Sequence, residues 1–522
     1  GNAGSQTITN GIDLAGEGGM VWFKRRNGAV NHVIFDTERW TASSGNGLFP
    51  NLTNAAGNIN ELTGFNSNGF GVTSSGYIND TFNMASWTFR KKSGFFDCVT
   101  WSGDNSTNRQ ISHSLSGPVG MIILKCTSHA SNWTVFHTSL GGTKRLVLNR
   151  GDISVQTSQE YWNNTNPTST NFTVGGSGDN NATGRTYVAY LFADNTAKDA
   201  DDQMIKCGSY SGTGGSGVTV NLGWEAQWVM VKKSSAASTW KLMDTMRGMT
   251  TPGSAGLGLV ANSDASEASD ETVRLDSRGF TIYPGSTFDI AGDYIYMAIR
   301  APMMVEPEAA TDVFAIDTAG SVSAAAPNFR STFPVDTALR FDTGGGTNYI
   351  ASRLTQGKYL VPQTTAAEVS TSVFKFDYSN GWDSRTSTVA TRYAYMWKRA
   401  KGFFDVVAYT GNGTAGRTVP HSLSVIPELM ICKRRSNTED WSVYNSTSGA
   451  THFLNLNNHD AANTAGNIWN NTAPTSTVFS LGNSSRVNGG GHTYIAYLFA
   501  TLDGISKVGS FTTTGSDVNV DC

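Results

Sequence analysis

Charge and long apolar runs are both scarce in this chain of 522 residues. Charged side chains make up 15% of it, and 38 Lys and Arg stand against 41 Asp and Glu, for a formal net charge of -3. Without an excess of positive charge, the surface has no general attraction for nucleic acid or anionic lipid. No stretch approaches the roughly 18 to 20 apolar residues of a membrane-spanning helix. We therefore expect no nucleic-acid partner and no membrane insertion.

Cysteine is also rare, and its positions follow no pattern. The five cysteines occupy no two equivalent places in the repeats described below. A disulfide framework or a metal site shared by the repeats would have repeated its ligands. The sequence therefore predicts buried free thiols at Cys98, Cys126, Cys207, Cys432 and Cys522.

Catalytic motifs are missing as well. The chain has no G-x-S-x-G, H-E-x-x-H or P-loop motif, and its glutamates show no paired pattern of the kind a glycosidase uses. His113 and His421 occupy matched positions in SHSL and PHSL, and we interpret them as structural residues at a strand entry. The acidic segment 194–203 could hold Ca²⁺ or be a solvated connector, and it lacks the spacing of a dedicated calcium loop. We predict no enzyme, no catalytic residue, no cofactor and no metal site.

Glycine is abundant, with 57 residues, and Ser, Thr and Asn accompany it throughout. This mixture disfavours long helices and supplies turns. Runs such as YIAYLFA (494–500) carry β-branched and aromatic residues that fit a pleated sheet. The chain is also too long for one hydrophobic core. We predict an all-β fold of tandem antiparallel β-sandwich modules, jelly-roll or lectin-like.

Two sequence periods are visible. GFFDCVTWSG (94–103) returns as GFFDVVAYTG (402–411) at an offset of 308. Inside this long period lies a shorter one of about 100 residues. An apolar run that ends in a base recurs as MVWFK (20–24), MIILK (121–125), WVMVK (228–232), TALR (337–340) and LMICK (429–433). Eight residues after the base stand His32, Trp133, Trp240, Asn348 and Trp441.

These repeats predict five modules and the start of a sixth, with three modules to each long period. The predicted bounds are 1–93 for module 1, 94–203 for module 2, 204–301 for module 3, 302–401 for module 4, 402–504 for module 5 and 505–522 for the start of module 6. Both ends fall inside a module, so we expect a piece of a longer polypeptide. Short connections predict that neighbouring modules pack against one another.

One segment that recurs between modules 2 and 5 allows two interpretations, a sugar contact or a scaffold turn. WNNTNPTST (162–170) returns as WNNTAPTST (469–477). A Trp beside two amides suits a sugar ring and its hydroxyls, so Trp162, Asn163, Asn164, Trp469, Asn470 and Asn471 are candidate carbohydrate contacts. The same residues are also typical of an Asn-rich turn against which the Trp packs.

Several motifs resemble a known group of repeats. GFFDVVAYTGNGTAGRTVPHSL, LMICKRRSNTEDWSVYN, WNNTAPTSTVFSLG and TYIAYLFA look like the tandem β-rich repeats of virion proteins of tailed phages that infect marine cyanobacteria and similar hosts. Such repeats are likened to concanavalin A-like or laminin-G-like sandwiches. The resemblance implies a tail fibre or other virion appendage outside the cell that attaches to the host surface. It further implies a homotrimer, with other virion proteins and a host surface glycan as partners.

Two other functions remain open. A carbohydrate-binding module array on a secreted adhesin would share the sandwiches and should repeat a ligand-contacting loop. A polysaccharide-degrading tailspike should instead carry a carboxylate cluster in a groove.

Overall fold

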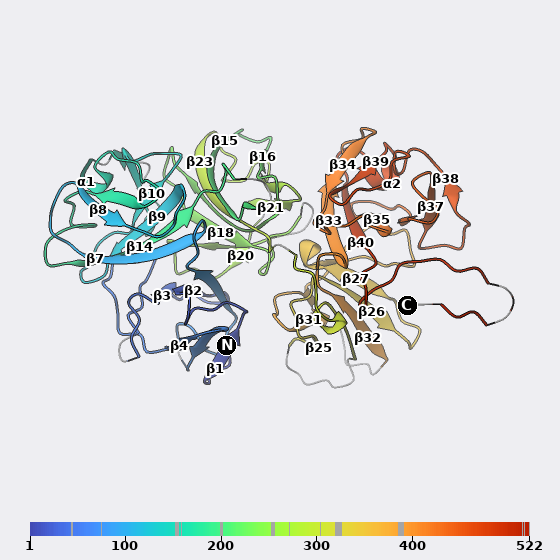
Figure 1. Cartoon of the computed structure of the whole chain (residues 1–522), viewed down its shortest axis with the longest axis horizontal. Coiled ribbons are helices and arrows are strands. Elements are labelled where there is room, and N and C mark those ends of the chain that lie inside the picture. The colour runs from blue at the N-terminus through green and yellow to red at the C-terminus, as the bar shows by residue number, and fades with distance from the viewer. Residues whose placement is uncertain are drawn as a thin grey trace. The chain divides into compact units, whose positions relative to one another are not determined.

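The regular secondary structure of the chain consists almost entirely of β-strands that pair antiparallel, as the computed structural model shows (Figure 1). The structure describes the chain except for residues 43–44, 75, 152–155, 158, 199–201, 252–255, 271, 303, 319–325, 385–390, 514, 516 and 521–522. Helices within the described part are single turns, namely α1 (Gln159–Trp162), α2 (Ser485–Asn488) and the 3-10 turns η2 (Ala310–Asp312) and η4 (Arg353–Thr355). The predicted all-β sandwich fold is confirmed.

The chain divides into two compact units. Unit 1 comprises Gly1–Asp244, Leu257–Val273 and Thr281–Arg300, and unit 2 comprises Thr245–Gly256, Arg274–Phe280 and Ala301–Cys522. Predicted modules 1 to 3 fall in unit 1, apart from two short segments and the last residue of module 3, and modules 4 and 5 fall in unit 2. We keep the module numbers below as names for the predicted residue ranges.

Module 2 is a sandwich of a six-stranded and a two-stranded sheet. The large sheet has the order β12-β11-β10-β9-β14-β7, and the small one pairs β13 with β8. The strands are β7 (Phe96–Ser102), β8 (Arg109–Ser112), β9 (Val119–Cys126), β10 (Thr134–His137), β11 (Lys144–Val147), β12 (Gln156–Thr157), β13 (Asn171–Val174) and β14 (Thr186–Ala193).

Module 5 has the same topology. Its large sheet has the order β33-β40-β35-β36-β37-β38, and its small sheet pairs β34 with β39. The strands are β33 (Phe404–Thr410), β34 (Arg417–Pro420), β35 (Leu429–Arg434), β36 (Ser442–Asn445), β37 (His452–Asn455), β38 (Asn463–Thr464), β39 (Val478–Leu481) and β40 (Thr493–Phe499). Val419 and Phe479 of the small sheet share a core with Met430 of the large one.

Module 3 repeats the large sheet in the order β15-β23-β17-β18-β19-β20. Its strands are β15 (Ile205–Gly212), β16 (Val218–Asn221), β17 (Ala226–Lys233), β18 (Trp240–Asp244), β19 (Leu257–Val260), β20 (Ala268–Ser269), β21 (Val273–Asp276), β22 (Gly279–Ile282) and β23 (Gly292–Arg300).

Modules 1 and 4 have smaller main sheets. Module 1 pairs β3-β2-β6 and β1-β5-β4, and module 4 pairs β24-β32-β26-β27, β25-β31-β30 and β28-β29. The strands of module 1 are β1 (Gln6–Thr9), β2 (Gly19–Arg25), β3 (Val33–Asp36), β4 (Leu62–Asn66), β5 (Gly69–Val72) and β6 (Met84–Arg90). Those of module 4 are β24 (Phe314–Thr318), β25 (Phe329–Arg330), β26 (Thr337–Asp342), β27 (Tyr349–Ser352), β28 (Lys358–Tyr359), β29 (Val369–Ser370), β30 (Phe374–Lys375), β31 (Gly381–Ser384) and β32 (Arg392–Trp397).

The central strands explain why the repeated runs are apolar at every position. All eight residues of β9 are buried, although successive side chains of a strand point to opposite faces. One face of this sheet lies on the module's own core, so the other must be covered by neighbouring modules. The hydrophobic cluster that contains Ile122 and Ile123 of β9 indeed also holds Met20 of module 1 and Met230 of module 3.

Candidate functional site

The two tryptophans of the WNNT segments are inside the protein. Trp162 and Trp469 are each only 1% exposed, and Trp162 packs edge-on against Phe136 with ring centroids 5.8 Å apart. Neither indole N–H finds a hydrogen-bond partner in the described part of the chain. A ring that is covered on both faces offers no platform for a sugar, so the stacking role predicted for these residues does not fit the structure.

The asparagines that follow form the turn that the alternative interpretation expects. Asn163, Asn164, Asn470 and Asn471 have φ values of 49°, 54°, 55° and 48°. This left-handed conformation is one that Asn tolerates better than most residues. The turn accounts for the repetition of WNNT, and of its four asparagines Asn164 and Asn471 are exposed.

The lysine that ends four of the five apolar runs lies buried near a joint between modules. Lys24, Lys125, Lys232 and Lys433 all have fully buried side chains. Lys125 Nζ donates to Thr53 O of module 1 at 3.0 Å, and Lys24 Nζ donates to Asp264 O of module 3 at 3.1 Å. Lys433 repeats the first contact in unit 2, where its Nζ lies 3.1 Å from Thr365 O of module 4. Lys24, Lys125 and Lys433 thus bind backbone carbonyls of another module, whereas Lys232 Nζ donates to Ser238 O of its own module at 2.7 Å.

The residue eight positions after the base makes a second contact across the joint. At four of the five positions a ring N–H reaches a backbone carbonyl of another module. The contacts are Trp133 to Phe49 O (3.0 Å) and Leu52 O (3.1 Å), Trp240 to Val147 O (2.9 Å), Trp441 to Thr364 O (3.0 Å) and His32 Nε2 to Val260 O (3.0 Å). His32 Nδ1 accepts from Trp22 Nε1 at 2.9 Å, which fixes the neutral Nε2–H tautomer.

The contacts in unit 1 run in a closed cycle. Module 2 donates to module 1, module 3 to module 2, and module 1 back to module 3. The fourth residue after each of these rings makes one further contact, and the three contacts again join modules 1 and 2, modules 2 and 3, and modules 1 and 3. These contacts are Tyr190 Oη to Asp36 Oδ2 (2.6 Å), Trp87 Nε1 to Asp244 Oδ2 (2.9 Å) and His137 Nε2 to Tyr296 O (3.0 Å). Each of the three modules is therefore bound directly to the other two.

An asparagine that the sequence analysis did not single out holds each of these rings in place. Its side-chain oxygen accepts the backbone N–H of the ring residue. The pairs are Asn51 with His32 (3.1 Å), Asn149 with Trp133 (2.8 Å), Asn262 with Trp240 (2.8 Å) and Asn457 with Trp441 (2.9 Å). An Asn 16 to 22 residues after the ring is the signal that could have revealed this clamp.

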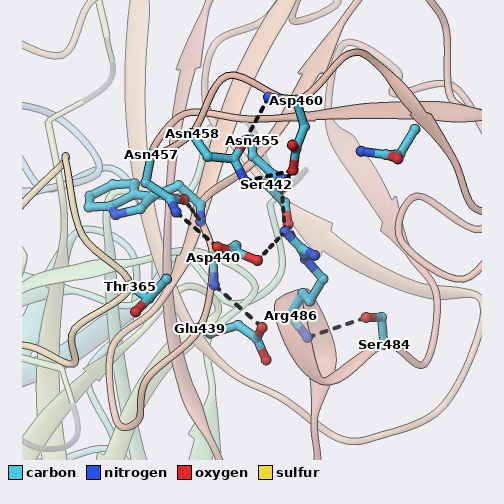
Figure 2. Close-up of polar contacts among 12 residues, drawn as sticks. Thr365, Glu439, Asp440, Ser442, Asn455, Asn457, Asn458, Asp460, Ser484 and Arg486 are labelled. Atoms are coloured by element: carbon cyan, nitrogen blue, oxygen red, sulfur yellow. Dashed lines mark hydrogen bonds and ion pairs between the residues drawn. The ribbon is translucent and has the colours of Figure 1, made fainter.

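Figure 2 shows the clamp of module 5 within a larger polar network. Asn457 Nδ2 donates to Asp440 Oδ1 at 2.8 Å, and Arg486 pairs with the other oxygen of Asp440 at 3.1 Å. Asn458 donates to Asp460 at 2.8 Å on the exposed side. Because the Arg486–Asp440 pair is part-exposed, it contributes little stability by itself. Its role is to orient Asn457, while Asn458 and Asp460 stay accessible to solvent.

Burial at the joints shifts the titration of these groups. It lowers the pKa of Lys24, Lys125 and Lys433 to about 8, because the charged ammonium loses hydration. Burial also lowers the pKa of His137 to about 4, so this imidazole is neutral. Ser139 N donates to its Nδ1 at 3.2 Å, in agreement with a proton on Nε2.

The thiols are buried as predicted where the structure describes them, and the paired histidines share one local contact. Four cysteines are free and buried, which confirms the prediction for Cys98, Cys126, Cys207 and Cys432, whereas Cys522 lies outside the described residues. His113 and His421 are buried, and the Nδ1 of each accepts the backbone N–H two residues on, at 3.3 Å. Each histidine directly follows the end of a strand, β8 or β34, and this contact holds its ring against its own turn.

Module 4 departs from the motif. Arg340, which the sequence aligns with the joint lysines, is turned into its own module, where its guanidinium lies 4.4 Å from the ring centroid of Tyr349 and 5.4 Å from that of Phe374. Asn348, aligned with the joint tryptophans, accepts from Asp342 N within the same module at 3.0 Å. The alignment of TALR with the other runs is therefore wrong by one residue. β26 continues to Asp342, and Arg340 points to the opposite face of its sheet from the joint lysines.

Metal-binding clusters and membrane-spanning helices can each be sought in the described part of the chain. Within those residues, no three His, Cys, Asp or Glu side chains gather as a metal site would require. In the same part of the chain, no helix has the length and apolar character to cross a membrane. Residues 199–201 of the acidic connector lie outside the described residues, so its predicted alternatives stay as they were.

Comparison with known proteins identifies one family. The sequence profile described as "Domain of unknown function (DUF7483)" matches residues 1–302 and 379–520. No curated protein and no solved structure matches the chain. The unmatched stretch, 303–378, covers most of module 4, where the joint motif is also altered. Because the match spans well over half of the chain, this protein belongs to the DUF7483 family.

Proposed function

We propose that this chain is a non-enzymatic structural and adhesive repeat protein, part of a phage tail fibre or another virion appendage that attaches to the host surface. The observation that carries the proposal is the repeated joint, in which a buried lysine and a ring N–H of one sandwich bind backbone carbonyls of another. Such joints convert separate modules into a stiff body.

Stiffness suits an appendage for a physical reason. A rigid connection keeps weak surface contacts at fixed spacing, so that binding at one contact raises the effective concentration of the next. The solvent-exposed amides of the WNNT turns and the Asn458–Asp460 pair are polar groups that could make such contacts with glycan hydroxyls. A homotrimer, expected from the resemblance, would multiply these contacts again.

The location can be tested in intact particles. Antibodies raised against the purified chain should label the tail fibres or a related appendage of the parent phage in electron micrographs. Labelling that is absent from the particle, or confined to the capsid interior, would refute the virion assignment.

The adhesive and non-enzymatic parts need separate assays. The purified chain should bind host cells or host surface polysaccharide in a pull-down, and binding should fall when Asn164 and Asn471 are both changed to Ala. A reducing-sugar assay on the same polysaccharide should detect no release. Measurable release would favour the degrading tailspike instead, and binding unchanged in the double variant would move the contact elsewhere.

A further inference from the structure

Unit 2 carries an apolar sheet face that is partly exposed. In the sheet β24-β32-β26-β27, Ile316 and Leu339 lie opposite Tyr395 on either side, and Phe341 lies opposite Tyr393. Ile316 is 57% and Phe341 39% exposed, and the other three are half-buried. We call these five residues the open face. Contiguous exposed apolar residues of this kind mark interaction surfaces.

The corresponding face of module 1 is fully covered in unit 1. It consists of Met20 and Trp22 on β2 with Trp87 and Phe89 on β6, and none of these is more than 9% exposed. They belong to one hydrophobic cluster with residues of modules 2 and 3. Module 3 contributes Trp228, Met230, Ile295, Met297 and Ile299 to it.

The joint between modules 4 and 5 reproduces only part of this arrangement. The ring centroids of Trp397 and Phe404 lie 6.2 Å apart, as those of Phe89 and Phe96 lie 5.8 Å apart at the joint of modules 1 and 2. In unit 1, Phe89 also meets Trp228 of module 3 at 6.1 Å. Within the described residues of unit 2, no ring of a third module contacts Trp397 as Trp228 contacts Phe89.

Module 5 is uncovered at the matching place. Leu148 of module 2 is completely buried, beside the Val147 carbonyl that accepts from Trp240 of module 3. Its counterpart Leu456, 308 residues on, is 45% exposed. Ile431 of β35 is likewise half-buried, whereas its counterpart Ile123 is 1% exposed. Leu148 and Ile123 both belong to the hydrophobic cluster of unit 1 that module 3 helps to form.

The chain also contains the opening sequence of another such module. KVGSFTTTGSDVNV (507–520) repeats KCGSYSGTGGSGVTV (206–220), which forms β15 and β16. β15 pairs along its whole length with β23 of module 3. The described part of 507–520 forms no strand, and Phe511 in it is 64% exposed.

We propose that the open face, together with Leu456 and Ile431, docks a third sandwich module of the same fold, whose first strands are residues 507–520. Its main sheet would cover modules 4 and 5 as that of module 3 covers modules 1 and 2. A binding surface of this kind selects a partner with a flat aromatic and aliphatic sheet face and a ring N–H donor at its edge.

A graft tests the docking directly. Residues 221–301 of module 3, which contain no cysteine, are repeated after residue 520 of the full chain to complete a module. Ile316→Cys and Leu456→Cys serve as reporters, labelled with a maleimide in the grafted chain and in a parent chain that ends at 520. The four buried thiols give little background. Labelling at both reporters should slow about tenfold or more in the grafted chain, because reaction then requires undocking.

Controls separate docking from other effects. Val369→Cys, 42% exposed on β29 and outside the open face, should label equally fast in both chains. Trp228→Asp in the appended copy alone should restore fast labelling at 316 and 456. Equal reporter rates in parent and graft, with the amides of the appended module protected from hydrogen exchange, would overturn the proposal. Slow labelling in the parent that depends on its concentration would overturn it too, because a second copy would then be the occupant.

Discussion

Replacing Trp133 with Phe should weaken the joint between modules 1 and 2, and a matched tryptophan in the same module provides the control. The Trp133 N–H lies 3.0 Å from Phe49 O and 3.1 Å from Leu52 O, and the side chain is fully buried. Trp162 is equally buried, but its N–H has no hydrogen-bond partner in the described residues. Both Trp→Phe changes shrink a buried ring by the same amount. They differ in the hydrogen bond that crosses the joint.

The difference can be estimated from the groups left behind. A buried carbonyl that loses its donor costs about 1–3 kcal/mol of stability. Phe49 O keeps a second donor, the N–H of Leu52 at 3.0 Å, so most of the loss falls on Leu52 O. Trp162→Phe removes a buried N–H that has no partner in the described part of the chain, so this variant loses no hydrogen bond and its destabilisation is smaller. Trp133→Phe should therefore destabilise unit 1 by about 1–3 kcal/mol more than Trp162→Phe.

Calorimetry and hydrogen exchange give the two readouts. Each kcal/mol corresponds to about 2–4 °C in the melting temperature of a unit of 150–250 residues, and somewhat less in a larger one. Exchange should also quicken in peptides covering 48–57 of module 1, although the substitution lies in module 2. Equal melting temperatures for the two variants, with unchanged exchange over 48–57, would refute the joint. Trp441→Phe and Trp469→Phe form the same pair in module 5.

Three further outcomes are expected. Burial lowers the pKa of Lys125 to about 8 in the folded chain, so between pH 8 and 10 the folded chain has lost a proton that the unfolded chain still holds. The free energy of unfolding should therefore rise over this range by up to about 1.4 kcal/mol per pH unit. Urea midpoints of Lys125→Met should rise less steeply with pH, and equal slopes for variant and parent would contradict the prediction. Asn457→Ala should lower the free energy of unfolding in urea by about 1–2 kcal/mol, because the Trp441 N–H and Asp440 lose their partner. The exposed Asn458→Ala should change it by no more than about 0.5 kcal/mol. Equal losses in the two variants would contradict the clamping role of Asn457. Burial raises the thiol pKa of Cys98, Cys207 and Cys432, so a thiol reagent should leave the native chain unlabelled at these residues and react after denaturation.

The repeat pattern located the joint residues without indicating their role. The lysine at the end of four apolar runs and the ring eight residues later were visible because they recur. A buried Lys and an exposed Lys look alike in sequence, however, and only the strand register places Lys125 on the face turned to module 1. The apolar composition of MIILK on both faces was the available sign of a covered strand, and β9 bears it out.

Other features depend on contacts that no local pattern encodes. The cycle of modules 1, 2 and 3 rests on pairs such as His32 with Val260, which are 228 residues apart. The burial of Trp162 could not be told from exposure, because a packing Trp and a sugar-stacking Trp have the same neighbours in sequence. TALR misled the alignment, since a one-residue change in register moves every side chain of a strand to the other face.

The bond from His32 to Val260 also orders events in time. A ribosome that adds about 5–20 residues per second needs roughly 10–45 s to travel from one residue to the other. For that interval His32 Nε2 lacks its Val260 acceptor, and the face of β2 around Trp22 lacks the part of its hydrophobic cluster that module 3 supplies. Nascent chains of this protein should therefore be held by chaperones until β19 emerges, and synthesis stalled before residue 257 should yield aggregates.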